Sequence, residues 1–266
     1  MRKPSLLLLL LVFLLPLSAL SEEAFDYGHV TEPYCPPGLR RIDEVETTEG
    51  IPADCFPYSA VACLDVEMAC GCSYPGGTAF LVAEDCLMTA GHMLVCLTHG
   101  QPVTRLRASF GYMKRDGKPD SYLYRYETDS PVYRYNSRVL TASGRAEWDY
   151  GYVRVPVEAG LTVGHFGLSV RSDEELTDLP VEVVGYPSGA FIPLTGHVTA
   201  VSERVLRHSA PTVPGHSGSP MFDADGYVVA VHNAHTVNSA GESVYSSAAR
   251  ITRDRIDEMR TRGFFQ

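Results

Sequence analysis

The chain consists mainly of short apolar segments separated by glycine or proline at intervals of roughly ten residues. Within these segments apolar and polar residues alternate, which is the period of a strand with one buried face. The segments are Gly76–Val82, Tyr133–Leu140, Tyr150–Val157, Val181–Val184, Gly196–Val201, Tyr227–Val231 and Ser243–Ser246. Only Ile251–Arg262 has the helical period, with Ile251, Ile256 and Met259 on one face. The pattern predicts an all-β fold of antiparallel strands, as a sandwich or a barrel, with a C-terminal helix.

One turn carries a candidate nucleophile. Residues Gly215–Met221 read Gly-His-Ser-Gly-Ser-Pro-Met and place Ser217 between two glycines. A serine hydroxyl needs a base beside it and backbone amides that stabilise the oxyanion formed on attack. Gly215 and Gly218 can adopt conformations closed to other residues, so the turn can direct the amides of Gly215 and Ser217 at one point as an oxyanion hole. Alone this motif is weak, because ordinary turns are rich in glycine and serine.

Two further motifs lie upstream in a meaningful order. His92 follows the strand-like segment Leu87–Thr89, and Asp149 begins an alternating apolar strand. The order His92, Asp149, Ser217 is that of one of the unrelated arrangements of a Ser-His-Asp triad. We therefore predict Ser217 as nucleophile, His92 as general base and then acid, and Asp149 as the group that orients the imidazole.

Other residues compete for these roles. Ser219 stands directly before Pro220, where the chain is expected to turn into the next strand. The alternative acids lack a following apolar strand; they are Asp120, Asp129 and Glu147. Each predicted triad residue also has a structural alternative, as a turn serine, a core or surface histidine, or a capping aspartate.

The motifs resemble those of trypsin-like serine proteases of the chymotrypsin fold, nearest to the glutamyl endopeptidase (V8-like) branch. Thr89–His92, Asp149–Gly151 and Gly215–Pro220 match its Thr-Ala-Gly-His, Asp-Tyr-Gly/Ala and Gly-Asn/Gln-Ser-Gly-Ser-Pro motifs. Gly164–Leu168 and Val184–Pro187 resemble its Phe-Gly-Leu and Gly-Tyr-Pro segments. The resemblance implies two antiparallel six-stranded β-barrels with the active site between them. It also implies a serine endopeptidase that hydrolyses peptide bonds through an acyl-enzyme.

The resemblance further implies a pocket for an acidic side chain before the cut. In that branch a threonine before the nucleophile and a histidine on the next strand bind the substrate carboxylate, and Thr212 and His232 occupy matching positions. Pro211 stands where a pocket for Arg or Lys would have an acid. The branch usually has Trp-Gly after this histidine, whereas this chain has Asn233-Ala234, so the Glu/Asp preference stays open.

The N-terminus has the build of a secretory signal peptide. Arg2 and Lys3 precede the apolar run Leu6–Leu15, and small residues follow as far as Ser21. A membrane anchor is the alternative, but the run is short for a spanning helix. We expect residues 1–21 to be removed, which places the protein in the extracellular or periplasmic space.

The remaining chain is expected to have two parts. Residues 22–45 form a leader or a propeptide, and Arg40-Arg41 offers a basic site at which a zymogen would be cut. Residues 46–266 form the trypsin-like serine protease domain with its two barrel halves. The net charge of −10 argues against nucleic acid or an anionic membrane as the main partner. We expect a monomer that binds protein or peptide substrates and uses no cofactor.

The seven cysteines all lie at or before position 96. Export favours disulfides, and an odd number leaves at least one thiol. Cys70-Gly71-Cys72 has a spacing that metal sites use, but the sequence shows no Cys-x-x-Cys pair or histidine partner for it, so disulfides are favoured. Cys86 and Cys96 flank His92 and are one pair that could brace its loop. A histidine-rich stretch lacks zinc-binding spacing, so no metal is expected; it comprises His197, His208, His216 and His235.

Two other functions remain open on this reading. A catalytically silent homologue would bind a partner through the same cleft, although such proteins usually lose a triad residue. An esterase would use the same triad, but the chain lacks the alternation of strands and helices of an α/β-hydrolase.

Overall fold

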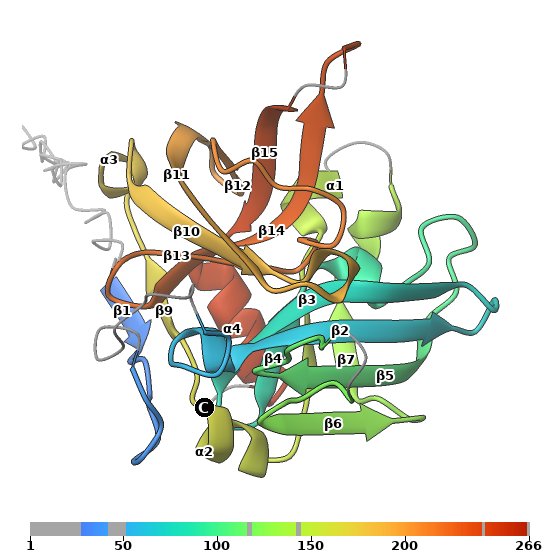
Figure 1. Cartoon of the computed structure of the whole chain (residues 1–266). Coiled ribbons are helices and arrows are strands. Elements are labelled where there is room, and N and C mark those ends of the chain that lie inside the picture. The colour runs from blue at the N-terminus through green and yellow to red at the C-terminus, as the bar shows by residue number, and fades with distance from the viewer. Residues whose placement is uncertain (1–27, 42–51, 116–118, 142–144, 241–242, 265–266) are drawn as a thin grey trace, which may run out of the picture.

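The computed structural model describes residues 28–41, 52–115, 119–141, 145–240 and 243–264. The chain forms two mainly antiparallel sheets that pack against each other, with short helices in the connections (Figure 1). The predicted all-β class and the C-terminal helix are confirmed. The helices are α1 Arg145–Trp148, α2 Glu158–Val163, α3 Asp173–Leu176 and α4 Arg253–Thr261, with 3₁₀ turns η2 Tyr58–Ala60, η3 Gly91–Met93, η4 Ser137–Leu140 and η5 Pro187–Gly189. In the described part of the chain, no helix combines the length and the apolar character needed to span a bilayer.

The N-terminal half is a seven-stranded sheet in the order β6-β5-β2-β3-β4-β8-β7. Its strands are β2 Val61–Met68, β3 Ser73–Ala83, β4 Cys86–Thr89, β5 Val103–Phe110, β6 Tyr124–Thr128, β7 Tyr133–Tyr135 and β8 Gly151–Arg154. Within the described residues no pairing joins the edge strands β6 and β7, so this half stays open rather than forming the expected closed barrel of six. Strand β7 is short because the Asn136 side chain accepts from the amide of Arg138 at 3.0 Å and turns the chain into η4.

The C-terminal half closes on itself. Strand β14 pairs with both β13 and β15, which completes a barrel of six strands in the order β14-β13-β10-β11-β12-β15. Strand β9 joins β14 in parallel, and β1 adds to β9. The strands are β1 Gly28–Thr31, β9 Gly167–Val170, β10 Pro180–Gly185, β11 Ile192–Val201, β12 Val205–His208, β13 Pro220–Phe222, β14 Tyr227–Val237 and β15 Ser243–Arg250.

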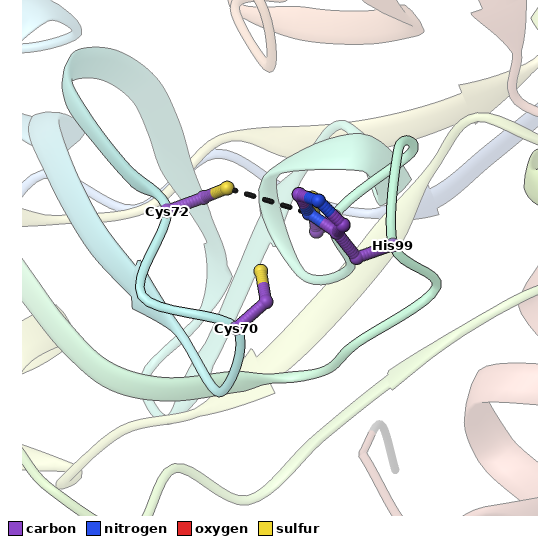
Figure 2. Close-up of side chains that lie close together, drawn as sticks. Cys70, Cys72 and His99 are labelled. Atoms are coloured by element: carbon purple, nitrogen blue, oxygen red, sulfur yellow. Dashed lines mark hydrogen bonds between the residues drawn. The ribbon is translucent and has the colours of Figure 1, made fainter.

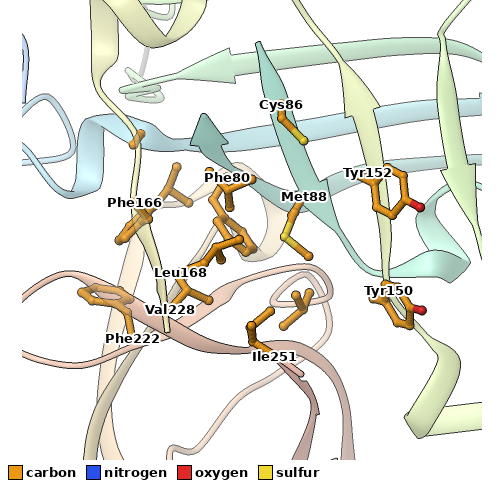
Figure 3. Packing of buried hydrophobic residues seen from close by; sticks show 14 of the residues in the cluster. Phe80, Cys86, Met88, Tyr150, Tyr152, Phe166, Leu168, Phe222, Val228 and Ile251 are labelled. Atoms are coloured by element: carbon orange, nitrogen blue, oxygen red, sulfur yellow. The ribbon is translucent and has the colours of Figure 1, made fainter. Parts of the chain in front are cut away.

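The two halves share an aromatic core (Figure 3). The ring of Phe80 on β3 meets that of Phe166 edge-on, with centroids 5.8 Å apart, and Phe166 lies 4.9 Å from Phe222 on β13. All three side chains are buried. Burial of each such side chain stabilises the fold by roughly 1.5–3 kcal/mol. This packing fixes the halves relative to each other, and therefore also fixes residues that they contribute to a common site.

Part of the expected leader is built into the fold. Residues 28–41 include β1, and Tyr34 exchanges two backbone hydrogen bonds with His165, at 2.9 and 3.0 Å. The Arg40 guanidinium donates to both carboxylate oxygens of Asp54 at 3.1 Å. The predicted signal peptide 1–21 and residues 22–27 and 42–45 lie outside the described residues, so signal cleavage and cutting at Arg40-Arg41 stay predictions.

The disulfides expected from export are not present among six of the described cysteines. In the structure Cys55, Cys63, Cys70, Cys72, Cys86 and Cys96 carry thiols. Cys86 and Cys96, the pair suggested to brace the His92 loop, lie in different cores. Cys86 lies in the core between the halves, and Cys96 lies in the core of the N-terminal sheet.

Candidate active site

Strand pairing brings His92 to Asp149. Thr89 at the end of β4 is paired with Gly151 at the start of β8, so the residues just beyond these strand ends meet. Nδ1 of His92 lies 2.7 Å from Oδ2 of Asp149, and the His92 amide donates to Oδ1 at 2.8 Å. Gly91 permits the approach, because a Cβ there would lie 3.0 Å from the Tyr150 carbonyl oxygen. The Asp149 side chain, only 5% exposed, thus holds both the ring and the backbone of His92.

The surroundings of His92 set its proton affinity. Burial lowers the pKa of the imidazole, but the charge and the hydrogen bond of Asp149 outweigh burial, and the pKa is raised overall. Arg145 opposes this rise. The arrangement therefore favours an imidazolium that forms when the ring takes up a proton.

The turn around Ser217 requires its glycines. Gly215 has φ +105° and Gly218 has φ +88°, in the left-handed region that favours glycine. A Cβ on Gly218 would lie 2.1 Å from the Thr78 carbonyl oxygen, and one on Gly215 would lie 2.4 Å from Cα of Pro187. Because both positions press against backbone of other elements, any larger residue would displace the turn.

Some backbone amides in and around this turn donate to protein carbonyl oxygens, and others do not. Gly218 donates to the His232 carbonyl oxygen at 2.8 Å, and Thr78 donates to the Ser217 carbonyl oxygen at 3.0 Å. Among the described residues, the amides of Gly215 and Ser217 donate to no protein acceptor. Two amides two residues apart are thus left for a ligand, at the positions predicted for the oxyanion hole.

The predicted residues meet at one pocket. A pocket of about 590 Å³ is lined by His92, Asp149, Ser217 and His232. Within the described residues, His92 hydrogen-bonds to Asp149 and its ring makes no hydrogen bond to the Ser217 hydroxyl. Such a bond often closes only when substrate is bound. The structure therefore places side chains from three distant segments around one pocket.

The competing residues lie elsewhere. Ser219 is fully buried, and a Cβ on Gly185 would lie 2.5 Å from its Oγ, so this hydroxyl faces the core. Asp120 instead accepts from the Tyr112 hydroxyl at 2.6 Å, and Asp129 lies 3.3 Å from the Arg105 guanidinium. Glu147 sits on α1.

Of the two predicted substrate-binding residues, only His232 is among the pocket-lining residues of the described chain. Nδ1 of His232 lies 3.1 Å from Nε2 of His208, and both rings are buried. Burial lowers the pKa of His232 well below its ordinary value, and the neighbouring His208 adds to the effect. The ring is therefore neutral near pH 7. Thr212 is buried, and its Oγ1 lies 2.7 Å from Oγ of Ser246.

The structure adds pocket residues that sequence reasoning did not identify. Arg145 and Arg207 both line the pocket, and both are exposed. Asn233 ties β14 to the segment before Asp149, because its Nδ2 donates to the Ala146 carbonyl oxygen at 2.8 Å. Neither the two cations nor this bridge has a signal in the sequence, since each depends on how distant segments meet.

Two bacterial proteases are similar in sequence to this chain. The chain is 28% identical over 203 residues to Extracellular metalloprotease of Bacillus subtilis (strain 168), covering 75% of this chain and 62% of that protein. It is 26% identical over 213 residues to Glutamyl endopeptidase of Bacillus licheniformis, covering 77% and 63%. The chain thus spans less than two thirds of the length of these relatives.

The fold has a counterpart among solved structures. A Glu endopeptidase in complex with MPD matches with a TM-score of 0.58 at 21% identity, over 78% of this chain and 91% of that one. A profile of the trypsin-like peptidase domain matches residues 77–231, a range that contains His92, Asp149 and Ser217. The resemblance seen in the motifs is confirmed, and the chain belongs to the trypsin-like peptidase family.

Proposed function

We propose that this protein is a secreted serine endopeptidase that hydrolyses peptide bonds with His92, Asp149 and Ser217. The observation that carries the proposal is the 2.7 Å contact between His92 and Asp149 in a pocket that Ser217 also lines. The two amides without protein acceptors beside Ser217 support it further. Export rests on the signal-peptide pattern of residues 1–21.

The proposed reaction begins when Oγ of Ser217 attacks the carbonyl carbon of the scissile bond. The Nε2 atom of His92 takes the hydroxyl proton, and the carboxylate of Asp149 stabilises the imidazolium. The amides of Gly215 and Ser217 would donate to the oxyanion of the tetrahedral intermediate. The imidazolium then protonates the leaving amine, and water attacks the acyl-enzyme by the same proton transfers to restore Ser217.

The pocket supports a preference for an acidic side chain near the cut. His232 and the exposed Arg207 both line it. When Nε2 of His208 donates to Nδ1 of His232, the single N–H of the neutral His232 ring is on Nε2. This N–H can then donate to a substrate carboxylate. Thr212 can donate to substrate only when Ser246 supplies the hydrogen of their shared bond. We therefore assign the carboxylate chiefly to His232 and Arg207.

A fluorophosphonate probe tests the proposed nucleophile. The exported protein should be labelled at Ser217, and the Ser217→Ala variant should lose labelling and peptide hydrolysis while remaining folded. Ser219→Ala is the matched control: its hydroxyl is buried without a hydrogen-bond partner among the described residues, so alanine should preserve both labelling and stability. A folded, exported wild-type protein that takes up no probe would favour the silent binding homologue instead.

A further inference from the structure

Four side chains with metal-binding atoms gather beside the active-site loop. Cys70 and Cys72 lie in the turn between β2 and β3, while Cys96 and His99 lie in the loop after η3. Their three sulfurs and a ring nitrogen of His99 all lie within 4.8 Å of one another. Figure 2 shows Cys70, Cys72 and His99 pointing toward one another from the two segments. Four ligand atoms converging from two turns have the number and the chemistry of a structural metal site.

The distances fit a tetrahedral ion. Nδ1 of His99 lies 3.3 Å from Sγ of Cys96 and 3.6 Å from Sγ of Cys72. Zinc–sulfur and zinc–nitrogen bonds of about 2.3 and 2.0–2.1 Å at tetrahedral angles give sulfur–nitrogen separations of about 3.6 Å. A disulfide would instead pair two of three sulfurs and would give the histidine no part. The presence of a fourth, nitrogen ligand at the right separation therefore favours a metal over a disulfide.

Backbone hydrogen bonds hold both turns. In the first turn, Gly71 donates to the Met68 carbonyl oxygen at 2.9 Å, and Met68 donates to that of Cys72 at 2.8 Å. In the second, Gly100 donates to the Cys96 carbonyl oxygen at 2.7 Å. The ligand-bearing segments are thus fixed by their own backbone contacts, which reduces the ordering required when a metal binds.

A further contact suits a thiolate. The hydroxyl oxygen of Tyr74 lies 3.6 Å from Sγ of Cys96. A hydroxyl can donate to a metal-bound thiolate, and such outer contacts orient the ligands of metal sites. Cys96 is fully buried, Cys70 and Cys72 are partly buried, and His99 is exposed. An ion could therefore enter from the His99 side and be covered on the other.

We propose that Cys70, Cys72, Cys96 and His99 bind one zinc ion in a structural Cys₃His site. The three thiols lose their protons to solvent when the ion binds, and the ring of His99 binds as neutral imidazole through Nδ1. Four protein ligands complete a tetrahedron and leave no position for a reacting water. The site thus differs from the catalytic pocket in chemistry, and its zinc takes no part in hydrolysis.

A second pair of ligand residues, Cys96 and His99, changes the expectation that the chain has no metal site. Cys70-x-Cys72 has no histidine beside it in the sequence, but Cys96-Leu97-Thr98-His99 supplies a cysteine and a histidine three residues apart. The two pairs are remote in sequence and become neighbours only in the fold, where the Ala69 amide donates to the Pro102 carbonyl oxygen at 2.8 Å.

The site would brace the loop that carries the catalytic base. Cys96 follows His92 by four residues, and Leu97, between two of the proposed ligands, lines the catalytic pocket. A zinc ion would link this loop to the β2–β3 turn. We expect metal loss to lower the melting temperature and to loosen the pocket wall at Leu97.

Metal titration tests the proposal without reference to proteolysis. The untagged, exported full-length protein is freed of metal under anaerobic reducing conditions and titrated with Co²⁺, then with Zn²⁺. We expect one equivalent of Co²⁺, with the visible bands of tetrahedral cobalt and a thiolate charge-transfer band, and displacement by one Zn²⁺. Wild type without these bands would overturn the proposal.

Variants assign the ligands. Cys72→Ser and His99→Ala should each weaken Co²⁺ binding by more than the 10–100-fold that loss of an outer contact costs. Cys63→Ser, a buried thiol outside the cluster, should leave binding unchanged. Circular dichroism confirms folding, and the exposed His99 makes its variant the one least disturbing to the core. Unchanged binding in both ligand variants would overturn the assignment, as would a disulfide between cluster cysteines in the exported protein as isolated.

Discussion

Nε2 of His208 lies 3.1 Å from Nδ1 of His232, and both rings are buried in the C-terminal barrel. Burial, with a smaller effect of His216, lowers the pKa of His208 to about 4. The pKa of His232 is also lowered, chiefly by burial. The barrel therefore contains two imidazoles that fold in their neutral forms, one of them in the wall of the catalytic pocket.

This pair should make the protein sensitive to acid. In the unfolded chain both histidines protonate near pH 6.5, whereas in the folded chain His208 does so near pH 4. Between these values the unfolded state binds more protons, so stability falls as pH falls. His208 alone should account for about 3 kcal/mol across this window. Urea unfolding measures how much the free energy of unfolding falls between pH 7 and pH 5. This fall should be smaller for His208→Gln than for wild type, and as large as in wild type for the exposed control His197→Gln. Equal losses in all three proteins would contradict the assignment.

The Asp149 carboxylate should control both the rate and the pH profile. Asp149→Asn should reduce turnover by about 10⁴, because the imidazolium loses its stabilising charge. The charge of Asp149 also raises the pKa of His92, so the acid limb of the residual activity should move to lower pH. Asp120→Asn removes a surface carboxylate bonded to Tyr112 and should leave both unchanged. Steady-state kinetics between pH 5 and pH 9 measures both effects, and an acid limb that stays in place in Asp149→Asn would argue against this pairing.

Two glycines with similar backbone conformation differ in how closely other atoms approach them. Gly218 has φ +88° and Gly38 has φ +85°. A Cβ on Gly218 would meet the Thr78 carbonyl oxygen at 2.1 Å, whereas one on Gly38 would meet no atom of the described residues within 4 Å. Gly38→Ala should cost about 1–2 kcal/mol, the cost of left-handed backbone. Gly218→Ala should cost more than about 3 kcal/mol and abolish activity, because the turn must move away from Thr78. Similar unfolding free energies for the two variants would show that the turn has more room than the structure gives it.

The cations of the pocket should influence substrate choice. We expect kcat/KM for a peptide with Glu before the cut to exceed that for its Gln analogue. Arg207→Gln should lower this ratio roughly 5-fold, which corresponds to about 1 kcal/mol for an exposed charge, and added salt should lower it in wild type. Arg134→Gln changes a cation on β7 outside this pocket and should have no effect. A ratio near one in wild type would exclude the acidic preference.

The period of apolar residues along the chain predicts much of the secondary structure. Alternating segments predicted strands such as Tyr227–Val231, which lies within β14, and the helical period before Arg262 predicted α4. The segment Tyr133–Leu140 was predicted as one strand but ends at Tyr135, because the Asn136 side chain favours a turn. Periodicity reports which face of a segment is buried, and it does not report a side-chain hydrogen bond that stops a strand.

The chain order of His92, Asp149 and Ser217 and the glycines around the serine were readable because they are local and chemically specific. Their meeting was decided by the register that pairs Thr89 with Gly151 and by the packing between the two halves. The same holds for Arg207 in the pocket and for Cys70 beside His99. Long-range pairing positions such groups: a one-residue shift in register would turn Arg207 on β12 to the opposite face of its sheet and would displace the turns that follow paired strands.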